Sequence, residues 1–216
     1  MKHRASKIKV LRKDIDLRVV YEDFDPEKYS TVVCTRCGYA TLDSYFGKIT
    51  EVEKKCIRDE ITPRFKSYRD KKTTYTYMDA IQRFSFVLAN AVAKKTKYSE
   101  SAYICLKNAW LLRGAYENYD FETCGMQKKE LIAREKIFLQ KAYSGFLTAV
   151  STEEFPICGM DKETYNYLLA ALAYKNGDDG IAGDMLAKII NNKFVSKRVK
   201  DRALELKELL RNGDKS

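Results

Sequence analysis

The stretch at residues 34–39 reads Cys34-Thr35-Arg36-Cys37-Gly38-Tyr39, and the period of the sequence changes on either side of it. Strand-like segments lead into this stretch, and a long run of amphipathic helical segments follows it. A C-x-x-C-G turn is typical of a metal-binding knuckle, because its two thiolates point to one side and its glycine lets backbone N–H groups approach the sulfurs. Cys34 and Cys37 are therefore candidate zinc ligands, although one knuckle is only half of a site.

Residues 1–46 are predicted to form a small β module. Apolar residues recur at every second position between residues 8 and 20, which is the period of a half-buried strand. They are Ile8, Val10, Ile15, Leu17 and Val19. We expect two strands here with a turn near Lys13-Asp14, and a further segment with Tyr29, Thr31 and Val33 that leads into the knuckle.

Residues 47–216 are predicted to form a helical domain of seven helices joined by short turns. Their apolar residues recur with the helical period, which places Val92 on the buried stripe of the second helix. The fourth helix is expected from about Lys128 to Val150, with Ile132 on its buried stripe. The fold class is therefore α+β and mainly α, with an antiparallel helical array after the β module.

The last part of the array resembles the helix-turn-helix of a tetratricopeptide repeat (TPR). The resemblance rests on Leu169-Ala170-x-x-Ala173-Tyr174-Lys175-Asn176-Gly177-Asp178 and on the apolar residues that follow. Small residues stand where the two helices of a repeat approach closely. We expect a tight turn at Asn176-Gly177, with Ala173 and Ala182 at the helix crossing and Lys175 on the solvent side.

The composition is that of a globular protein, with 45% hydrophobic and 12% aromatic residues. No apolar run approaches the roughly 18 residues of a membrane span, and the first residues are charged, so we expect a cytoplasmic protein. Six cysteines are scattered in a pattern that does not indicate a disulfide framework. The net charge of +10 is concentrated at residues 2–13 and 188–207, which permits contact with nucleic acid, anionic lipid or an acidic protein.

Several N-terminal motifs resemble those of the bacterial DUF2225 family. They are Ser6-Lys7-Ile8-Lys9-Val10, Lys13-Asp14-x-Asp16, Asp25-Pro26-x-x-Tyr29 and Val33-Cys34-x-x-Cys37-Gly38-Tyr39-Ala40. The resemblance implies a cytoplasmic protein with a zinc-ribbon-like N-terminal region, a TPR-like helical C-terminal region and no established reaction. Family members typically carry another C-P-x-C-G upstream of the segment that matches Met1 to Lys7, and a further cysteine after the paired aspartates. The given sequence begins too late to hold the upstream pair, which leaves open whether that pair is trimmed or lost, and Arg18 stands near the position of the further cysteine.

The knuckle has two chemical interpretations besides that of a plain turn. A structural zinc site needs four ligands, and only His3 and Cys56 are near in the sequence to complete it. A dithiol redox site is the other interpretation, because Arg36 would help to lower a thiol pKa. Thioredoxin-like motifs begin a helix after a parallel strand, and that context is not predicted here.

Nothing in the sequence indicates an enzyme. The chain has a single histidine, and it contains no phosphate-cradling glycine loop and no H-E-x-x-H motif. Asp14 and Asp16 are expected at a strand edge, where solvated charge is the ordinary explanation. A non-catalytic protein is therefore favoured, with an enzyme of unrecognised type left open.

The function favoured by this architecture is a scaffold whose helical face receives a protein or peptide. The candidate partner-binding residues are Tyr103, Tyr143 and Tyr174, with Trp110 as a further residue of either groove or core. The alternative is a nucleic-acid-associated protein that uses basic residues of the β module. These residues are Lys7, Lys9, Arg12 and Lys13.

Overall fold

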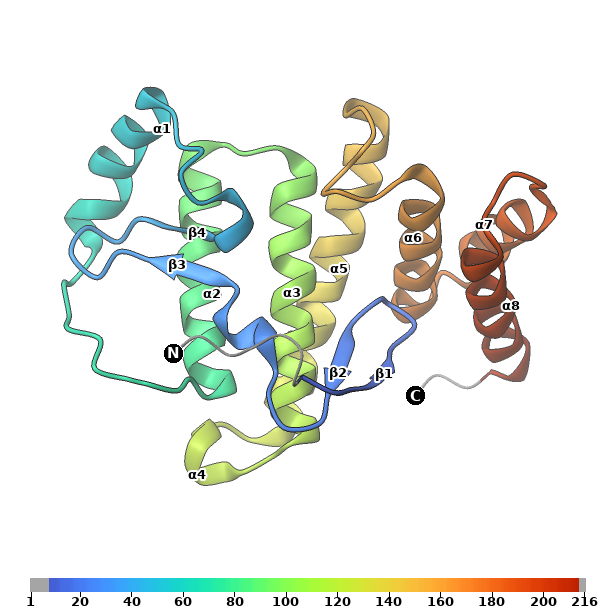
Figure 1. Cartoon of the computed structure of the whole chain (residues 1–216), viewed down its shortest axis with the longest axis horizontal. Coiled ribbons are helices and arrows are strands. Elements are labelled where there is room, and N and C mark those ends of the chain that lie inside the picture. The colour runs from blue at the N-terminus through green and yellow to red at the C-terminus, as the bar shows by residue number, and fades with distance from the viewer. Residues whose placement is uncertain (1–7, 214–216) are drawn as a thin grey trace.

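The main helices stand side by side in one row, and the N-terminal strands lie against one face of that row (Figure 1). This arrangement is seen in a computed structural model that describes residues 8–213. The helices are α1 (Glu51–Cys56), α2 (Tyr77–Lys94), α3 (Tyr98–Glu117), α4 (Phe121–Cys124), α5 (Lys128–Thr152), α6 (Lys162–Asn176), α7 (Asp179–Asn191) and α8 (Lys197–Asn212). The α+β fold class, mainly α, is therefore confirmed. The short α4 was not predicted.

The strands form two separate antiparallel pairs, β1 (Val10–Lys13) with β2 (Val19–Tyr21) and β3 (Thr31–Val33) with β4 (Ala40–Leu42). The prediction that Ile15 and Leu17 belong to the second strand was wrong. The backbone turns there, because the Asp14 N–H donates to the Arg18 carbonyl at 2.8 Å and Leu17 has a φ of 71°. Ile15 and Leu17 instead pack against the helical core.

Capping side chains explain where α1 and α2 start. Thr50 and Glu53 form the capping box of α1 that the sequence pattern indicates, and Thr76 forms another with Asp79 at the start of α2. After α1 the chain continues through a wider turn at Ile57–Ile61 and a tighter one at Thr62–Arg64. These turns place the segment beside the knuckle.

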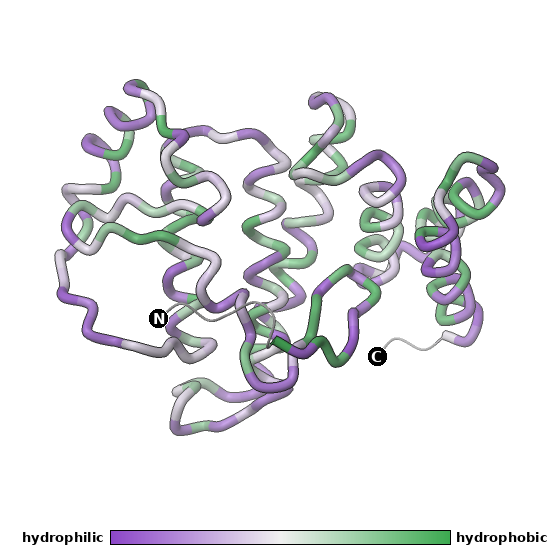
Figure 2. Tube along the Cα trace, viewed as in Figure 1, coloured by the Kyte–Doolittle hydropathy of each residue, from purple (hydrophilic) through white to green (hydrophobic). Residues whose placement is uncertain are grey.

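The core lies between the helices of the row, with α3 in contact with both α2 and α5. Figure 2 shows polar and hydrophobic residues alternating along the helices, as one-sided burial requires. Two residues predicted to be buried are exposed, Val92 to 68% and Ile132 to 46%. The row is one layer thick, so it leaves more helix surface open than a closed bundle would.

Helices α6 and α7 form the predicted hairpin. Gly177 has a φ of 88°, and the Asp178 N–H donates to the Ala173 carbonyl at 2.9 Å, which ends α6 within one turn. Ala173 and Ala182 are both fully buried. Within residues 8–213, no helix is both long and apolar enough to span a lipid bilayer.

Enlarging Ala182 tests whether the α6–α7 crossing is tightly packed. We expect Ala182→Leu to lower the free energy of unfolding by roughly 1–3 kcal/mol, because the added atoms overpack a filled interior. Urea denaturation measures the change. The matched control is Ala133→Leu on the exposed side of α5, which should stay within about 0.5 kcal/mol of the parent. Equal effects of the two substitutions would contradict a close crossing at Ala182.

Candidate functional site

A hollow of about 450 Å³ lies where the β1–β2 hairpin meets α3 and α6. Its walls come from both the N-terminal segment and the helices. The lining residues are Lys13, Leu17, Arg18, Val19, Tyr21, Asp25, Pro26, Glu27, Ser30, Asp43, Tyr103, Leu106, Lys107, Trp110, Met160, Thr164 and Leu168. We call it the aromatic hollow, because Tyr21, Tyr103 and Trp110 contribute ring surface to it.

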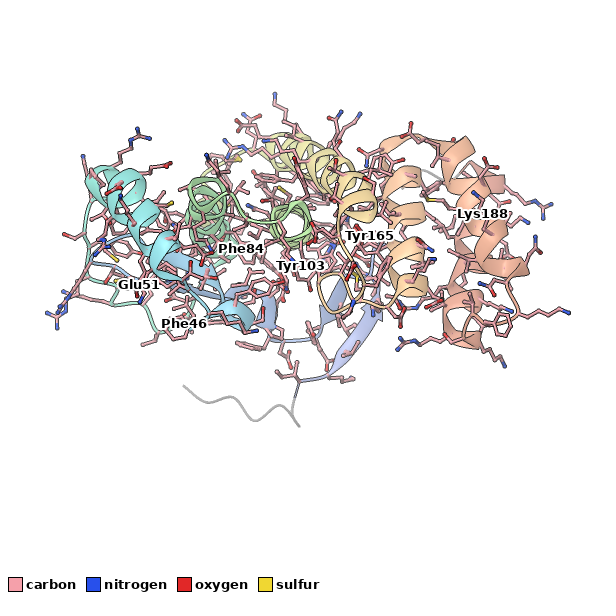
Figure 3. All side chains as sticks on the ribbon, turned by 90° about the horizontal axis from the view of Figure 1, so that it is seen from above. Phe46, Glu51, Phe84, Tyr103, Tyr165 and Lys188 are labelled. Carbon is pink, nitrogen blue, oxygen red and sulfur yellow. The ribbon has the colours of Figure 1, made fainter. Side chains whose placement is uncertain are left out.

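The α3 wall of the aromatic hollow is built around Lys107. Its ammonium lies 5.0 Å from the Tyr103 ring centre and 5.9 Å from that of Trp110, and the two rings meet edge to face at 6.5 Å. Figure 3 shows Tyr103 on the side of α3 that faces the N-terminal strands. The Trp110 indole nitrogen is buried. This residue therefore offers ring surface to the hollow, and not a hydrogen-bond donor.

Lys107 also ties the N-terminal segment to α3. Its Nζ donates to both carboxylate oxygens of Glu27 at 2.7 Å. Burial lowers the pKa of Lys107, but the charge of Glu27 outweighs burial and raises the pKa overall. The ammonium therefore stays charged, and the pair fixes the turn at Pro26–Tyr29 over the rings.

A second hollow of about 540 Å³ adjoins the first, and Arg18, Tyr21 and Asp25 line both. Leu11 and Tyr77 are among its other lining residues. We call the two hollows together the groove; the lining of the first is mainly apolar and that of the second more polar.

A buried ionic network beneath the hairpin holds the groove together. Arg113 of α3 donates from Nη1 and Nη2 to the two oxygens of Asp16 at 3.0 and 2.6 Å, and from Nε to Glu135 of α5 at 2.7 Å. Arg18 donates to Glu117 at 2.6 Å. Asp16, Arg113 and Glu135 are 0%, 5% and 6% exposed. We call this set, with Asp14, the Arg113 network.

The expectation that Asp14 and Asp16 are solvated was wrong. Arg113 donates a hydrogen bond from Nη1 to Asp14 Oδ2 at 3.0 Å, and Asp16 is completely buried. Burial raises the pKa of Asp16, but the charge of Arg113 and its hydrogen bonds outweigh burial and lower the pKa overall. The turn at residues 14–18 carries both carboxylates away from solvent and onto α3.

The placement of Lys175 on the solvent side was also wrong. This side chain is half-buried on α6, and burial together with the charge of Arg113 lowers its pKa. Tyr143 and Tyr174 lie buried in the helical core and line neither hollow of the groove, whereas Tyr103 lines the first.

The basic residues proposed for nucleic acid have different environments. Lys9 pairs with Glu22 at 3.0 Å, and Arg12 pairs with Asp14 and Glu117. Lys13 is exposed, and Lys7 lies outside the described residues.

Hydrogen bonds within the knuckle, from Thr62 and from Asn90 hold it in place. Within it the Cys34 N–H donates to the Tyr39 carbonyl at 2.7 Å, and the Thr62 hydroxyl donates to the Cys37 carbonyl at 3.0 Å. The buried Asn90 of α2 donates to the Gly38 carbonyl at 2.9 Å. Gly38 has a φ of 78°, and a Cβ there would lie 2.6 Å from the Phe65 ring, so only glycine fits.

The two thiols of the knuckle have different acidities. Backbone N–H groups of Cys37 and Arg36 lower the pKa of Cys34, whereas burial raises the pKa of Cys37. Among residues 8–213, no three histidine, cysteine or acidic side chains gather to hold a metal ion. Cys56 therefore does not join the knuckle, and His3 lies outside the described residues. These residues supply two of the four ligands of a closed zinc site and do not fit one alone.

The comparison with family models matches residues 1–210 to "Uncharacterized protein conserved in bacteria (DUF2225)". The chain belongs to the DUF2225 family. No curated protein and no solved structure matches it. The family membership predicted from the N-terminal motifs is therefore confirmed. The groove and the Arg113 network are features of this DUF2225 chain's own structure.

Sequence reasoning missed Lys107, Glu27, Arg113 and Glu135. One signal was available, because Arg113 interrupts an apolar run at residues 109–115 of a predicted helix. A charged residue at such a position needs a buried partner. The sequence does not indicate which carboxylates provide it.

Replacing Asp16 tests the Arg113 network. We expect Asp16→Asn to destabilise the protein by about 3 kcal/mol or more at pH 7, because Arg113 loses its bidentate partner while buried. The folded-state pKa of Asp16 is lowered, so its stabilising contribution is present above the ordinary value of 3.8 and is lost as pH falls through the folded pKa. The difference between variant and parent should therefore shrink below about pH 4.

Urea denaturation at neutral and acidic pH measures this difference. The control is Asp184→Asn on the exposed face of α7, which should change stability by less than about 0.5 kcal/mol. A difference for Asp16→Asn that does not diminish in acid would show that the carboxylate charge is not what stabilises the fold.

Proposed function

We propose that this chain is a non-catalytic scaffold that binds an extended segment of a partner protein in its groove. The observation that carries the proposal is the aromatic hollow, in which Tyr103 and Trp110 flank the Lys107–Glu27 ion pair. Aromatic side chains are enriched in protein interfaces because they bury much area at a small cost in side-chain entropy. A ligand would therefore find apolar surface beside a fixed polar group.

The size and openness of the groove favour a peptide over a small metabolite. Two adjoining hollows of about 450 and 540 Å³ share three lining residues, which suits a chain whose successive side chains enter successive hollows. Lining charges of both signs, including Asp25 and Lys28, provide partners for backbone or side-chain polar groups.

The proposal includes a TPR-like character for the C-terminal helices and a cytoplasmic location. The tight α6–α7 hairpin, in which Ala173 and Ala182 are fully buried, supports the former. All six cysteines are free thiols, which supports a reducing compartment.

We also propose zinc as the metal for the knuckle, with its remaining ligands supplied from outside residues 8–213. The support is the preformed turn, in which N–H groups favour a Cys34 thiolate and Gly38 is fixed by α2. No part of the proposed scaffold role depends on this metal.

Alkylation of the cysteines tests the zinc proposal. Cys34 should react fastest with iodoacetamide near neutral pH, because its pKa is lowered, and Cys105 slowest, because burial raises its pKa to about 11. Added zinc should slow the labelling of Cys34 and Cys37 but not that of Cys158. Mass spectrometry of the labelled peptides measures the rates. Unchanged rates at both knuckle thiols would leave the knuckle as a plain turn.

Selection of peptides on the purified chain tests the scaffold proposal. We expect peptides selected from a phage-displayed random library to change the fluorescence of Trp110, the only tryptophan in the sequence. Tyr103→Ala should weaken their binding by about tenfold or more, because a buried aromatic anchor is lost. Tyr98→Ala, at an exposed position of the same helix, should change it by less than about twofold. Equal losses, or no selected peptide, would contradict the proposal.

A further inference from the structure

Lys13 of the basic N-terminal segment meets arginines of the basic C-terminal segment in the folded chain. Lys13 ends β1, Arg198 and Arg202 stand one turn apart on α8, and all three line one surface hollow of about 300 Å³. Tyr167 of α6 lines the same hollow with a buried side chain. We call this site the basic hollow. It shares Lys13 with the aromatic hollow, but Arg198 and Arg202 line the basic hollow and not the aromatic one, so its role does not rest on the proposed scaffold function.

The cations of the basic hollow form no close ion pair within the described part of the chain, although the charge of Arg198 helps to lower the pKa of Asp161. Among residues 8–213, none of Lys13, Arg198 and Arg202 forms an ion pair, whereas Arg12 and Arg18 nearby are paired. Burial and repulsion from the two arginines lower the pKa of Lys13. Like charges held together in this way are relieved by an anion that binds between them.

Three carboxylates also line the basic hollow and restrict what can bind. Asp14 is already bonded by Arg12, Arg18 and Arg113. Asp201 and Glu205 lie on α8 and pair with none of the three cations. A broad polyanion laid over this surface would meet both of these carboxylates, which favours a compact anion as the ligand.

We propose that the basic hollow binds the phosphate group of a small phosphorylated molecule. Arginine presents a planar fork that bonds two phosphate oxygens at once, and Lys13 adds a point charge from β1. A volume of about 300 Å³ is at the lower end of the range for small-molecule sites, and it suits a compact phosphate ester.

Calorimetric titration of the full chain with inorganic phosphate and with pyrophosphate tests this proposal. Both anions should bind at low ionic strength, and Arg202→Gln should weaken binding by about tenfold or more. Arg202→Lys should lose less, because it keeps the charge but not the fork. Lys207→Gln, at an exposed position of α8 that does not line the hollow, should change affinity by less than about twofold.

The melting temperature of each ligand-free variant reports whether it folds. If Arg202→Gln fails to fold, Arg198→Gln at an exposed position carries the same test. Absence of binding by both anions would overturn the proposal, as would an equal loss in Lys207→Gln. Binding of a single-stranded oligonucleotide that pyrophosphate does not displace would also overturn it, because that result assigns the surface to a nucleic acid.

Discussion

Arg113 is the constraint on which the rest of the structure depends. A guanidinium that is 5% exposed on the central helix must have carboxylate partners, and those that bond it come from other elements than α3. Glu135 on α5 satisfies Nε, and Asp16 in the hairpin turn satisfies both terminal nitrogens. The same requirement therefore sets the α3–α5 packing and the position of the hairpin on α3.

The energetic role of this network is specificity more than net stability. Removing two charges from water costs several kcal/mol for each, and the ion pair returns roughly that amount, so an apolar replacement of the whole network could be about as stable. An apolar hairpin turn, however, could slide along the apolar surface of the row. The bidentate Asp16–Arg113 geometry gives one position for the turn, and the Glu27–Lys107 pair gives a second fixed point along α3.

The sequence was informative where structure depends on local patterns. The turn at Asn176-Gly177 was predicted, and the Thr50-x-x-Glu53 pattern indicates the α1 cap, because each depends on residues within one turn of a helix. The Arg113 network was not predicted, since Asp16 and Glu135 lie 97 and 22 positions from Arg113 in the sequence. Alternation at Ile15 and Leu17 predicted a strand, but Asp16 between them points into the network, so a polar residue at an alternate position was buried rather than solvated.

The same long-range pairing explains why the groove could not be predicted and why its occupant would affect the whole chain. One wall comes from residues 13–30 and the other mainly from α3 and α6, so the aromatic hollow exists only while the hairpin is docked. A ligand that binds this docked state and not the undocked one adds its binding free energy to the docking equilibrium. The Arg113 and Lys107 ion pairs hold the walls in register before any ligand arrives, which reduces the entropy that a ligand must overcome. Any ligand of the groove would therefore be linked in one equilibrium with the attachment of the N-terminal segment to the helices.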